Sequence, residues 1–225
     1  MTIKPLEVLR QVPLFASLPD EELEAFAPLM RERRFPRGSV ILMQGDPGDA
    51  LYVIASGQVK VVLIGEDGRE VILSVLGLGS FFGEMALLDD DPRSAHVVAM
   101  EEATLLQLRR EDFQARLRSS PDVAIALLRE LTHRLRRADD TIGSLALRDV
   151  NGRIAHLLLE LAEEEGGAHI TRRLTHATLA QMVGASRETV SRTLRALTNA
   201  GAVQVSRKEI KILDPEMLQR LAQHV

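Results

Sequence analysis

The chain of 225 residues contains no cysteine and no tryptophan, and aromatic residues make up only 3% of it. The absence of cysteine excludes disulfides, thiolate zinc sites, iron–sulfur clusters and cysteine nucleophiles. The shortage of aromatic residues argues against a stacking platform for single-stranded nucleic acid. No stretch reaches the roughly 18 consecutive apolar residues that a membrane span needs. What is present, 45% hydrophobic and 27% charged residues, is the balance of a folded soluble chain.

The first residues also lack the apolar segment of a signal peptide, since Lys4, Glu7 and Arg10 interrupt them with charge. We therefore expect a cytoplasmic protein with no membrane partner. No spacing resembles a metal-ligand motif or a nucleophile–base pair, so we expect no metal and no enzymatic activity.

The net charge of -4 conceals an uneven distribution along the chain. Residues 1–118 carry 13 Lys and Arg against 19 Asp and Glu, a balance of -6, whereas residues 171–211 carry 8 against 2, a balance of +6. A basic stretch within an acidic protein indicates a local binding site for a polyanion. A solvated basic face is the alternative reading.

The hydrophobic pattern changes three times. Residues 5–34 are predicted to be helical, and from Phe35 to Leu108 short apolar segments alternate with glycine-rich turns, as in a β-sandwich or β-barrel. The strands are expected at residues 40–43, 51–54, 59–64, 71–76, 96–99 and 104–108.

Residues 121–148 then predict one long helix. Its apolar residues recur at alternating spacings of three and four, which is the seam of a two-helix coiled coil and favours a homodimer. A core helix that packs within its own domain is the alternative. The seam consists of Leu128, Leu131, Leu135, Ala138, Ile142 and Leu145.

A hinge is expected near Leu147–Val150, where the seam ends. The remaining segments are predicted as helices at 152–164, 175–183 and 187–200, strands at 203–205 and 209–213, and a terminal helix.

The segment FGEMALLDDDPRSA, residues 82–95, combines groups that suit a phosphate. Gly83 lets a ligand approach the backbone, and Met85–Leu88 can form a helical turn whose free amides point at an anion. Arg93, the only cation of the segment, supplies a planar fork of donors, and Ser94 supplies a hydroxyl.

Glu84 does not suit a phosphate, and its expected partner is a sugar hydroxyl. One phosphate beside one free hydroxyl is what a cyclic nucleotide presents. A loop held together by a Glu–Arg salt bridge is the alternative interpretation of the same residues.

Residues 175–197 predict two helices joined by a tight turn at Gly184, with Ser186 placed to cap the second helix. Such a second helix can read DNA, because Arg pairs with guanine and Glu accepts from cytosine. An ordinary helical hairpin is the alternative. The side chains expected to project from its first two turns are Arg187, Glu188 and Arg192. The following strands, with Arg207, Lys208 and Lys211, would form a basic wing.

At these motifs the chain resembles the CRP/FNR family of bacterial transcription regulators, in particular its cyclic-AMP receptor branch. The resemblance is nearly full length. It rests on the segments Leu51–Lys60, Phe81–Ala95, Asp149–Ala155 and Gly184–Val190, which lie in the order expected for the family.

The resemblance implies an α+β fold in three parts. These are a β-roll (jelly-roll) cyclic nucleotide-binding domain over 1–120, a dimerisation helix and hinge over 121–148, and a winged helix-turn-helix domain over 149–225. It also implies a homodimer that binds a near-palindromic double-stranded DNA site when a cyclic nucleotide favours one domain arrangement. RNA polymerase is a further expected partner.

The implied residue roles follow the motifs. For the nucleotide, Gly83 and Glu84 would meet the ribose, Arg93 and Ser94 the phosphate beside the amides of Met85 and Ala86, and Val61, Leu73 and Ser74 the base. For the DNA, the residues are Ser186, Arg187, Glu188, Thr189 and Arg192, with Arg207 and Lys208 in the wing.

The family's base-contacting pair on the long helix falls on Ala138 and Asp139, where this sequence departs from the hydroxyl or amide residues usual in cyclic-AMP receptors. Asp139 can only accept hydrogen bonds, which suits an adenine amino group and suits the paired donors of guanine better. A solvated helix charge is its alternative role.

Cyclic AMP is the first choice of effector, with cyclic GMP second. Cyclic di-GMP, a ligand-independent regulator and the regulatory subunit of a nucleotide-controlled enzyme are the alternatives. The cluster-dependent oxygen sensors of the family are excluded because the chain has no cysteine, whereas six histidines leave a haem-sensing relative open.

Overall fold

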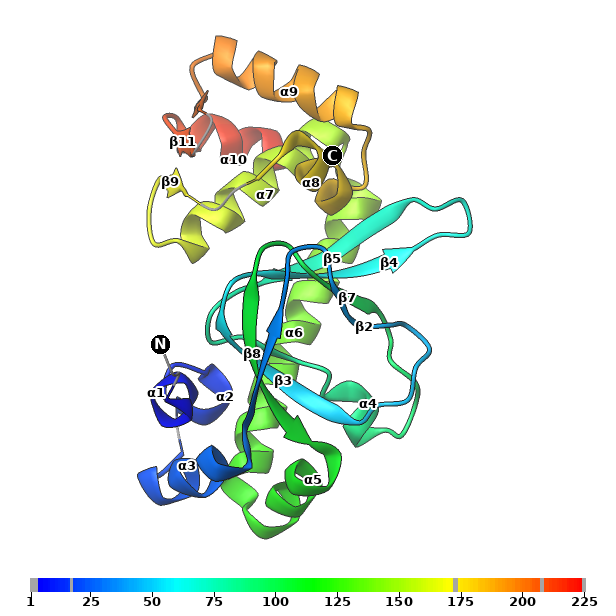
Figure 1. Ribbon diagram of the computed structural model, residues 1–225. Helices are drawn as coiled ribbons and strands as arrows, with labels where there is room; N and C mark the ends of the chain where they lie inside the picture. The colour runs from blue at the N-terminus through cyan, green and yellow to red at the C-terminus, as the bar shows by residue number, and fades with distance from the viewer. Residues whose placement is uncertain (1–3, 17, 172–173, 207–208, 224–225) are drawn as a thin grey trace. The chain divides into compact units, whose positions relative to one another are not determined.

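The computed structural model describes residues 4–16, 18–171, 174–206 and 209–223 (Figure 1), and the chain divides into two compact units, 1–135 and 136–225. The division falls within the long helix. The first unit opens with short helical segments in place of one continuous helix. They are α1 (Pro5–Leu9), α2 (Pro13–Ala16), α3 (Asp20–Phe26) and the 3-10 turn η1 (Ala27–Leu29).

A β-roll of two antiparallel four-stranded sheets follows, as the sequence predicts. One sheet has the order β1-β8-β3-β6 and the other the order β2-β7-β4-β5. The strands are β1 (Arg31–Phe35), β2 (Val40–Leu42), β3 (Ala50–Ser56), β4 (Val59–Ile64), β5 (Glu70–Leu76), β6 (Phe81–Phe82), β7 (His96–Ala99) and β8 (Ala103–Arg109).

The prediction of helix up to residue 34 is wrong, because residues 31–35 form β1. Arg31, Glu32, Arg33 and Arg34 are all exposed, so the strand shows no apolar alternation. It is an edge strand, paired among the described residues with β8 only, and its stability comes from that pairing. The two-residue strand β6 and the helix α5 (Arg110–Ser119) were not predicted either.

The core of the β-roll has two parts. One lies between the sheets and includes Tyr52, Ile54, Phe82 and Leu105. The other, which includes Phe81, packs the N-terminal helices, α5 and the first turns of α6 against the sheet of β3 and β8. Consecutive residues Phe81 and Phe82 thus enter different parts of the core, which fixes the backbone immediately before Gly83.

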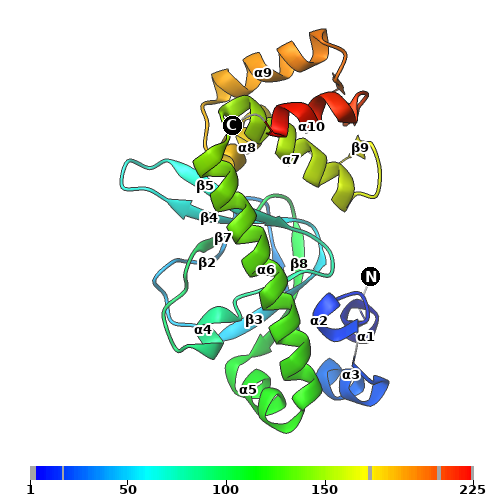
Figure 2. The same ribbon diagram turned by 180° about the vertical axis from the view of Figure 1, so that it is seen from behind.

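Helix α6 (Pro121–Leu147) runs without a break, as its heptad pattern predicts. Its first turns pack into the core of the β-roll through Val123, Ala126 and Leu127. Figure 2 shows the ribbon of these turns beside α5. A different face of the helix carries the predicted seam, and most of that seam is uncovered in the single chain. Leu128, Leu135 and Ile142 are each 63% exposed and Leu145 is 47% exposed, whereas Leu131 packs partly on the core.

Helix α6 ends at the predicted hinge, and α7 begins at Val150 after two non-helical residues. The second unit surrounds a core of its own and contains a small sheet of order β10-β11-β9. None of the described helices is long and apolar enough to cross a membrane. The remaining elements are α7 (Val150–Glu164), β9 (His169–Ile170), α8 (His176–Val183), α9 (Arg187–Asn199), β10 (Val203–Val205), β11 (Ile210–Ile212) and α10 (Pro215–Gln223).

Candidate functional site

The motif at residues 82–95 folds as a strand end, a turn and one helical turn, α4 (Met85–Leu88), as the sequence predicts. Gly83 has a φ of +87°, a left-handed conformation. A Cβ atom at this position would lie 2.8 Å from Nη1 of Arg93 and 3.0 Å from the carbonyl oxygen of Ala50. Glycine is required here for both its conformation and the close approach of its neighbours.

Arg93 lies inside the motif and is only 4% exposed. Its Nη1 donates to the carbonyl oxygen of Gly83 at 2.6 Å, and its Nη2 donates to the carbonyl oxygen of Ala50 at 2.8 Å and to Oδ1 of Asp49 at 3.0 Å. The Nε atom is buried and has no hydrogen-bond partner among the described residues. An unpaired buried donor on a cation is costly, and an anionic ligand would satisfy it.

Glu84 is also buried, at 3% exposed. The alternative interpretation, a loop held by a salt bridge between Glu84 and Arg93, is only partly correct. Both side chains form ion pairs, but with residues outside the motif. Oε1 of Glu84 accepts from Nη1 of Arg134 on α6 at 2.9 Å, while Arg93 pairs with Asp49. The guanidinium of Arg134 also donates to the carbonyl oxygen of Phe81 at 2.7 Å and lies over its ring.

Ser94, next to Arg93, is exposed, and its hydroxyl lies 3.7 Å from the sulfur of Met85. Met85 and Ala86 are the first two residues of α4, where backbone amides have no partner within the helix. The structure therefore places the hydroxyl of Ser94 beside the side chain of the first residue of α4.

An aromatic pair supports the backbone of the motif from the sheet. Tyr52 of β3 is opposite Phe82 and stacks on it, with ring centroids 5.4 Å apart and an interplanar angle of 12°. Nε2 of Gln107 donates to the Tyr52 hydroxyl oxygen at 3.2 Å. Burial, and next the Asp49 carboxylate, raise the pKa of Tyr52 above its usual value, so the phenol stays neutral at physiological pH.

The predicted base-lining residues lie on the neighbouring strands β4 and β5. Val61 pairs with Ser74 and Val62 pairs with Ile72, so Leu73 has no direct partner and forms a β-bulge. Bulges re-aim side chains, and this one leaves Leu73 52% exposed beside Ser74. Ala138 and Asp139 are both exposed on α6, within the second unit.

The second predicted site is the pair of helices α8 and α9. Gly184 ends α8 in a left-handed conformation, with a φ of +62°. The hydroxyl of Ser186 accepts from the amide of Thr189 at 3.1 Å and pairs with the Thr189 hydroxyl at 2.9 Å, which confirms the predicted cap of α9. Both hydroxyls are therefore engaged in the cap.

Beyond this cap, Arg187, Glu188 and Arg192 are exposed, as expected of side chains that project from the helix. Arg195, which sequence reasoning did not select, is exposed one turn beyond Arg192 on the same face. Its spacing of three from Arg192 could have indicated it. The predicted wing residues Arg207 and Lys208 lie outside the described residues.

The motif Asp149–Arg153 fastens these helices. Asp149 caps α7 by accepting from the amide of Gly152 at 2.7 Å. Nε of Arg153 donates to the carbonyl oxygen of Val183 at the end of α8, at 2.9 Å. The hydroxyl of Thr193 on α9 donates to Oδ1 of Asn151 at 2.7 Å. Both helices of the pair are thus held by one turn of α7.

Sequence reasoning assigned no role at the nucleotide motif to Asp49, Arg110 or Arg134, although all three contact it. Their partners lie far along the chain, and Arg134 is 50 residues from Glu84. No local pattern could have identified them, because the contacts exist only after the β-roll has closed.

Comparison with known proteins finds a matching domain family for each of the two segments that contain these residues. The cyclic nucleotide-binding domain family matches residues 32–120, and the Crp-like helix-turn-helix domain family matches residues 152–221. The cyclic AMP receptor protein of Thermus thermophilus is 40% identical over 210 residues, which cover 93% of this chain and 96% of that protein. The CRP-like cAMP-activated global transcriptional regulator of Mycobacterium tuberculosis is 35% identical over 221 residues, or 96% and 99% of the two chains.

Among solved structures, the c-di-GMP responsive global regulator CLP of Xanthomonas campestris has a TM-score of 0.74 and 29% identity. The match covers 86% of this chain and 99% of that chain.

Proposed function

The chain belongs to the CRP/FNR family of DNA-binding transcription regulators, and on this basis we propose that cyclic AMP is the effector that controls its binding to DNA. The observation that carries the proposal is the buried guanidinium of Arg93, whose Nε lacks a partner among the described residues. A cyclic phosphate supplies the missing acceptor together with a negative charge.

In this proposal each group of the motif has one task. Arg93, the hydroxyl of Ser94 and the amides of Met85 and Ala86 hold the phosphate. Glu84 accepts a hydrogen bond from the ribose hydroxyl, because a carboxylate with one oxygen on Arg134 retains capacity on the other. Val61, Leu73 and Ser74 line the base.

The ion pair between Glu84 and Arg134 gives the ribose a direct connection to α6. A nucleotide changes DNA affinity only if it binds one conformation of the protein more tightly than another. A contact at Glu84 that stabilises or weakens its pair with Arg134 is one physical source of such a difference.

The DNA-binding part of the proposal assigns the base edges to Arg187, Glu188 and Arg192 and places Ser186, Thr189, Arg207 and Lys208 nearer the phosphates. A homodimer would read a near-palindrome whose half-sites are about one helical turn, ~34 Å, apart. RNA polymerase is the proposed partner at promoters, by family resemblance.

Calorimetric titration with cyclic AMP, cyclic GMP and cyclic di-GMP in turn tests the effector. We expect cyclic AMP to bind most tightly and to raise affinity for a palindromic duplex in a gel-shift assay. Tightest binding of cyclic di-GMP would favour the behaviour named for the Xanthomonas relative. DNA binding unaffected by all three nucleotides would contradict effector control.

Arg187→Ala is expected to weaken binding to the preferred duplex by about 1–3 kcal/mol and to relax preference at one base pair. The loss arises because alanine at this position cannot make the proposed bidentate contact to guanine. Fluorescence anisotropy with duplexes substituted at each position measures both effects. Arg220→Ala, which removes one exposed positive charge from α10, is the control. Equal losses on every sequence for both variants would show that Arg187 acts only through charge.

Asp139→Ala is expected to change the ratio of affinities for cyclic AMP and cyclic GMP. If the carboxylate meets the base, guanine loses two hydrogen bonds and adenine one, so cyclic GMP affinity should fall further. Paired titrations of the wild type and the variant measure the ratio. The neighbouring exposed residue Asp140 provides a charge-matched control, Asp140→Ala. An unchanged ratio in Asp139→Ala would make this residue a solvated helix charge.

A further inference from the structure

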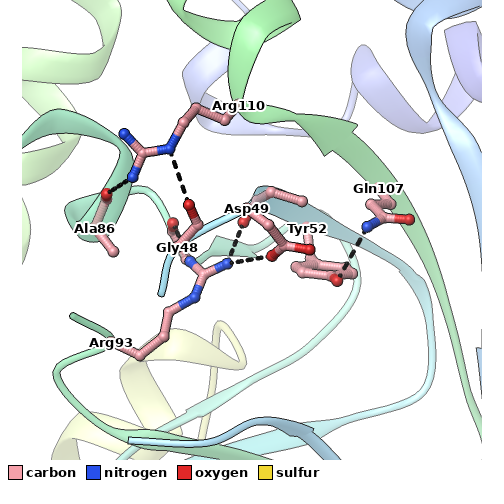
Figure 3. Close-up of polar contacts among 9 residues, drawn as sticks. Gly48, Asp49, Tyr52, Ala86, Arg93, Gln107 and Arg110 are labelled. Atoms are coloured by element: carbon pink, nitrogen blue, oxygen red, sulfur yellow. Dashed lines mark hydrogen bonds and ion pairs between the residues drawn. The ribbon is translucent and has the colours of Figure 1, made fainter. Parts of the chain in front are cut away.

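Arg110, the first residue of α5, lies between two segments that border the proposed phosphate site (Figure 3). Its Nε donates to the carbonyl oxygen of Gly48 at 2.9 Å, and its Nη2 donates to the carbonyl oxygen of Ala86 in α4 at 2.5 Å. Its backbone amide donates to the carbonyl oxygen of Asp49 at 2.9 Å. One residue therefore binds both segments at once.

The first of these segments controls Arg93. Asp49 and Ala50 supply two of the acceptors that hold the Arg93 guanidinium. Figure 3 shows Arg93 and Arg110 reaching the segment that contains Gly48 and Asp49 from different directions. Any shift of residues 48–50 would therefore move the Arg93 guanidinium as well.

The second segment is α4, whose first amides are proposed to meet the phosphate. The two segments touch, because a Cβ atom on Gly48 would lie 2.5 Å from Cβ of Ala86. Arg110 joins them across this contact. Gln114, one turn later in α5, donates to the carbonyl oxygen of Leu87 at 3.0 Å and adds a second connection to α4.

The loop after α4 is also held by Arg110. Asp90 has a φ of +61° and is the sole non-glycine residue with a positive φ among the described residues. Its carboxylate forms an ion pair with Nη1 of Arg110. The contact supports a backbone conformation that is unfavourable for most side chains. From Asp90 the loop continues toward Arg93.

We propose that Arg110 is a positioning residue that sets the distance between Arg93 and the amides of α4, and so fits this phosphate site to a cyclic phosphate. The inference rests on the proposed function. Arg110 does not itself hold the phosphate, since its side-chain nitrogens are committed to Gly48, Ala86 and Asp90. It acts through the two segments that do.

The first test compares two arginines of the same helix. Arg110→Met removes the connection between the segments, and Arg116→Met removes a contact of α5 with the N-terminal helices. The two side chains are similarly buried, at 27% and 30% exposed. Arg116 donates to the carbonyl oxygen of Ala25 at 3.2 Å and lies over the ring of Phe26.

We expect Arg110→Met to lower cyclic AMP affinity at least about tenfold, by analogy with the loss of an outer hydrogen-bonding partner at metal sites. Arg116→Met should leave it within about twofold, a change too small for a lost hydrogen bond at the site. Arg110→Lys retains the charge but cannot reach all three acceptors, and an intermediate affinity is expected. Calorimetry measures affinity, and thermal melting reports stability for each variant.

The second test separates positioning from a general loss of stability. The Sp and Rp phosphorothioates of cyclic AMP place sulfur, a weaker acceptor than oxygen, at one or the other exocyclic position. A change in the distance between Arg93 and the amides of α4 alters the ratio of the affinities for the Sp and Rp compounds. Simple destabilisation lowers both affinities equally. We expect the ratio to change in Arg110→Met and to remain at the wild-type value in Arg116→Met.

The outcomes are distinct. An Arg110→Met protein that melts at a lower temperature but retains wild-type affinity and ratio would overturn the positioning role. A wild-type protein that binds none of the three cyclic nucleotides would instead overturn the proposed function on which this role depends. If the wild type binds cyclic GMP alone, the phosphorothioates of cyclic GMP serve as the probes.

Discussion

Arg93→Ala is expected to lower the affinity for cyclic AMP more than a hundredfold. The substitution removes the proposed charge-assisted contact of the guanidinium to the phosphate, which is worth on the order of 3 kcal/mol. The nearby guanidiniums of Arg110 and Arg134 do not replace it, because they are engaged with carbonyl and carboxylate oxygens.

Structure adds a second expectation for this variant. Arg93 donates to the carbonyl oxygens of Gly83 and Ala50, so its removal takes away these two hydrogen bonds and costs roughly 1–3 kcal/mol of stability. Arg93→Lys retains the charge and one of these bonds, and it should lose less stability while still binding nucleotide more weakly than the wild type.

The matched control is Arg10→Ala. Nη2 of Arg10 lies 3.0 Å from Oδ1 of Asp20, the same separation as between Arg93 and Asp49, but the pair is on the exposed surface. Exposed pairs contribute little, so affinity and melting temperature should both stay near wild type. Calorimetric titration measures the cyclic AMP affinity, and thermal melting the stability, of Arg93→Ala, Arg93→Lys and Arg10→Ala beside the wild type. Wild-type affinity in a folded Arg93→Ala protein would refute the phosphate assignment.

Leu135→Asp is expected to produce a monomer and to lower DNA affinity by a factor of about 10² to 10⁴. The lower affinity follows because two linked half-site contacts bind far more tightly than one. Leu135 is 63% exposed in the single chain, so the substitution should leave the protomer folded. In a dimer the same position would bury a charge in the apolar seam, which is strongly unfavourable.

His133→Asp is the control for this variant. His133 is exposed on α6 but outside the predicted seam, and both substitutions introduce one carboxylate. Light scattering at micromolar concentration measures the oligomeric state, and a gel shift measures DNA binding. A Leu135→Asp protein that remains dimeric would place the dimer interface elsewhere on the chain.

Sequence alone predicts those parts of the molecule whose cause is local. The repeat of apolar residues is enough to predict the unbroken helix α6, and Ser186 and Gly184 are enough to predict the turn between α8 and α9. In the nucleotide motif, Gly83 and the helical turn after it follow from the intrinsic conformational preferences of a few consecutive residues.

Other features follow from tertiary structure only. Strand β1 is predicted as helix from the sequence because its charged residues show no apolar alternation. As an edge strand it takes its stability from pairing with β8, a partner more than 60 residues away. The orientation of Arg93 into the protein depends on Asp49 and Ala50, which no spacing within its own motif reveals.

The same reason explains the supporting arginines. A guanidinium can bond several carbonyl oxygens at once, so its role is set by whichever backbone segments the fold brings within reach. Composition and periodicity predict a β-sandwich or β-barrel, a long helix and two helices joined by a tight turn, and the family resemblance implies the β-roll and the helix-turn-helix. Only the closed β-roll decided that Arg134 meets Glu84 and that Arg110 joins Gly48 to Ala86, because those contacts connect segments that are adjacent in space and distant in sequence.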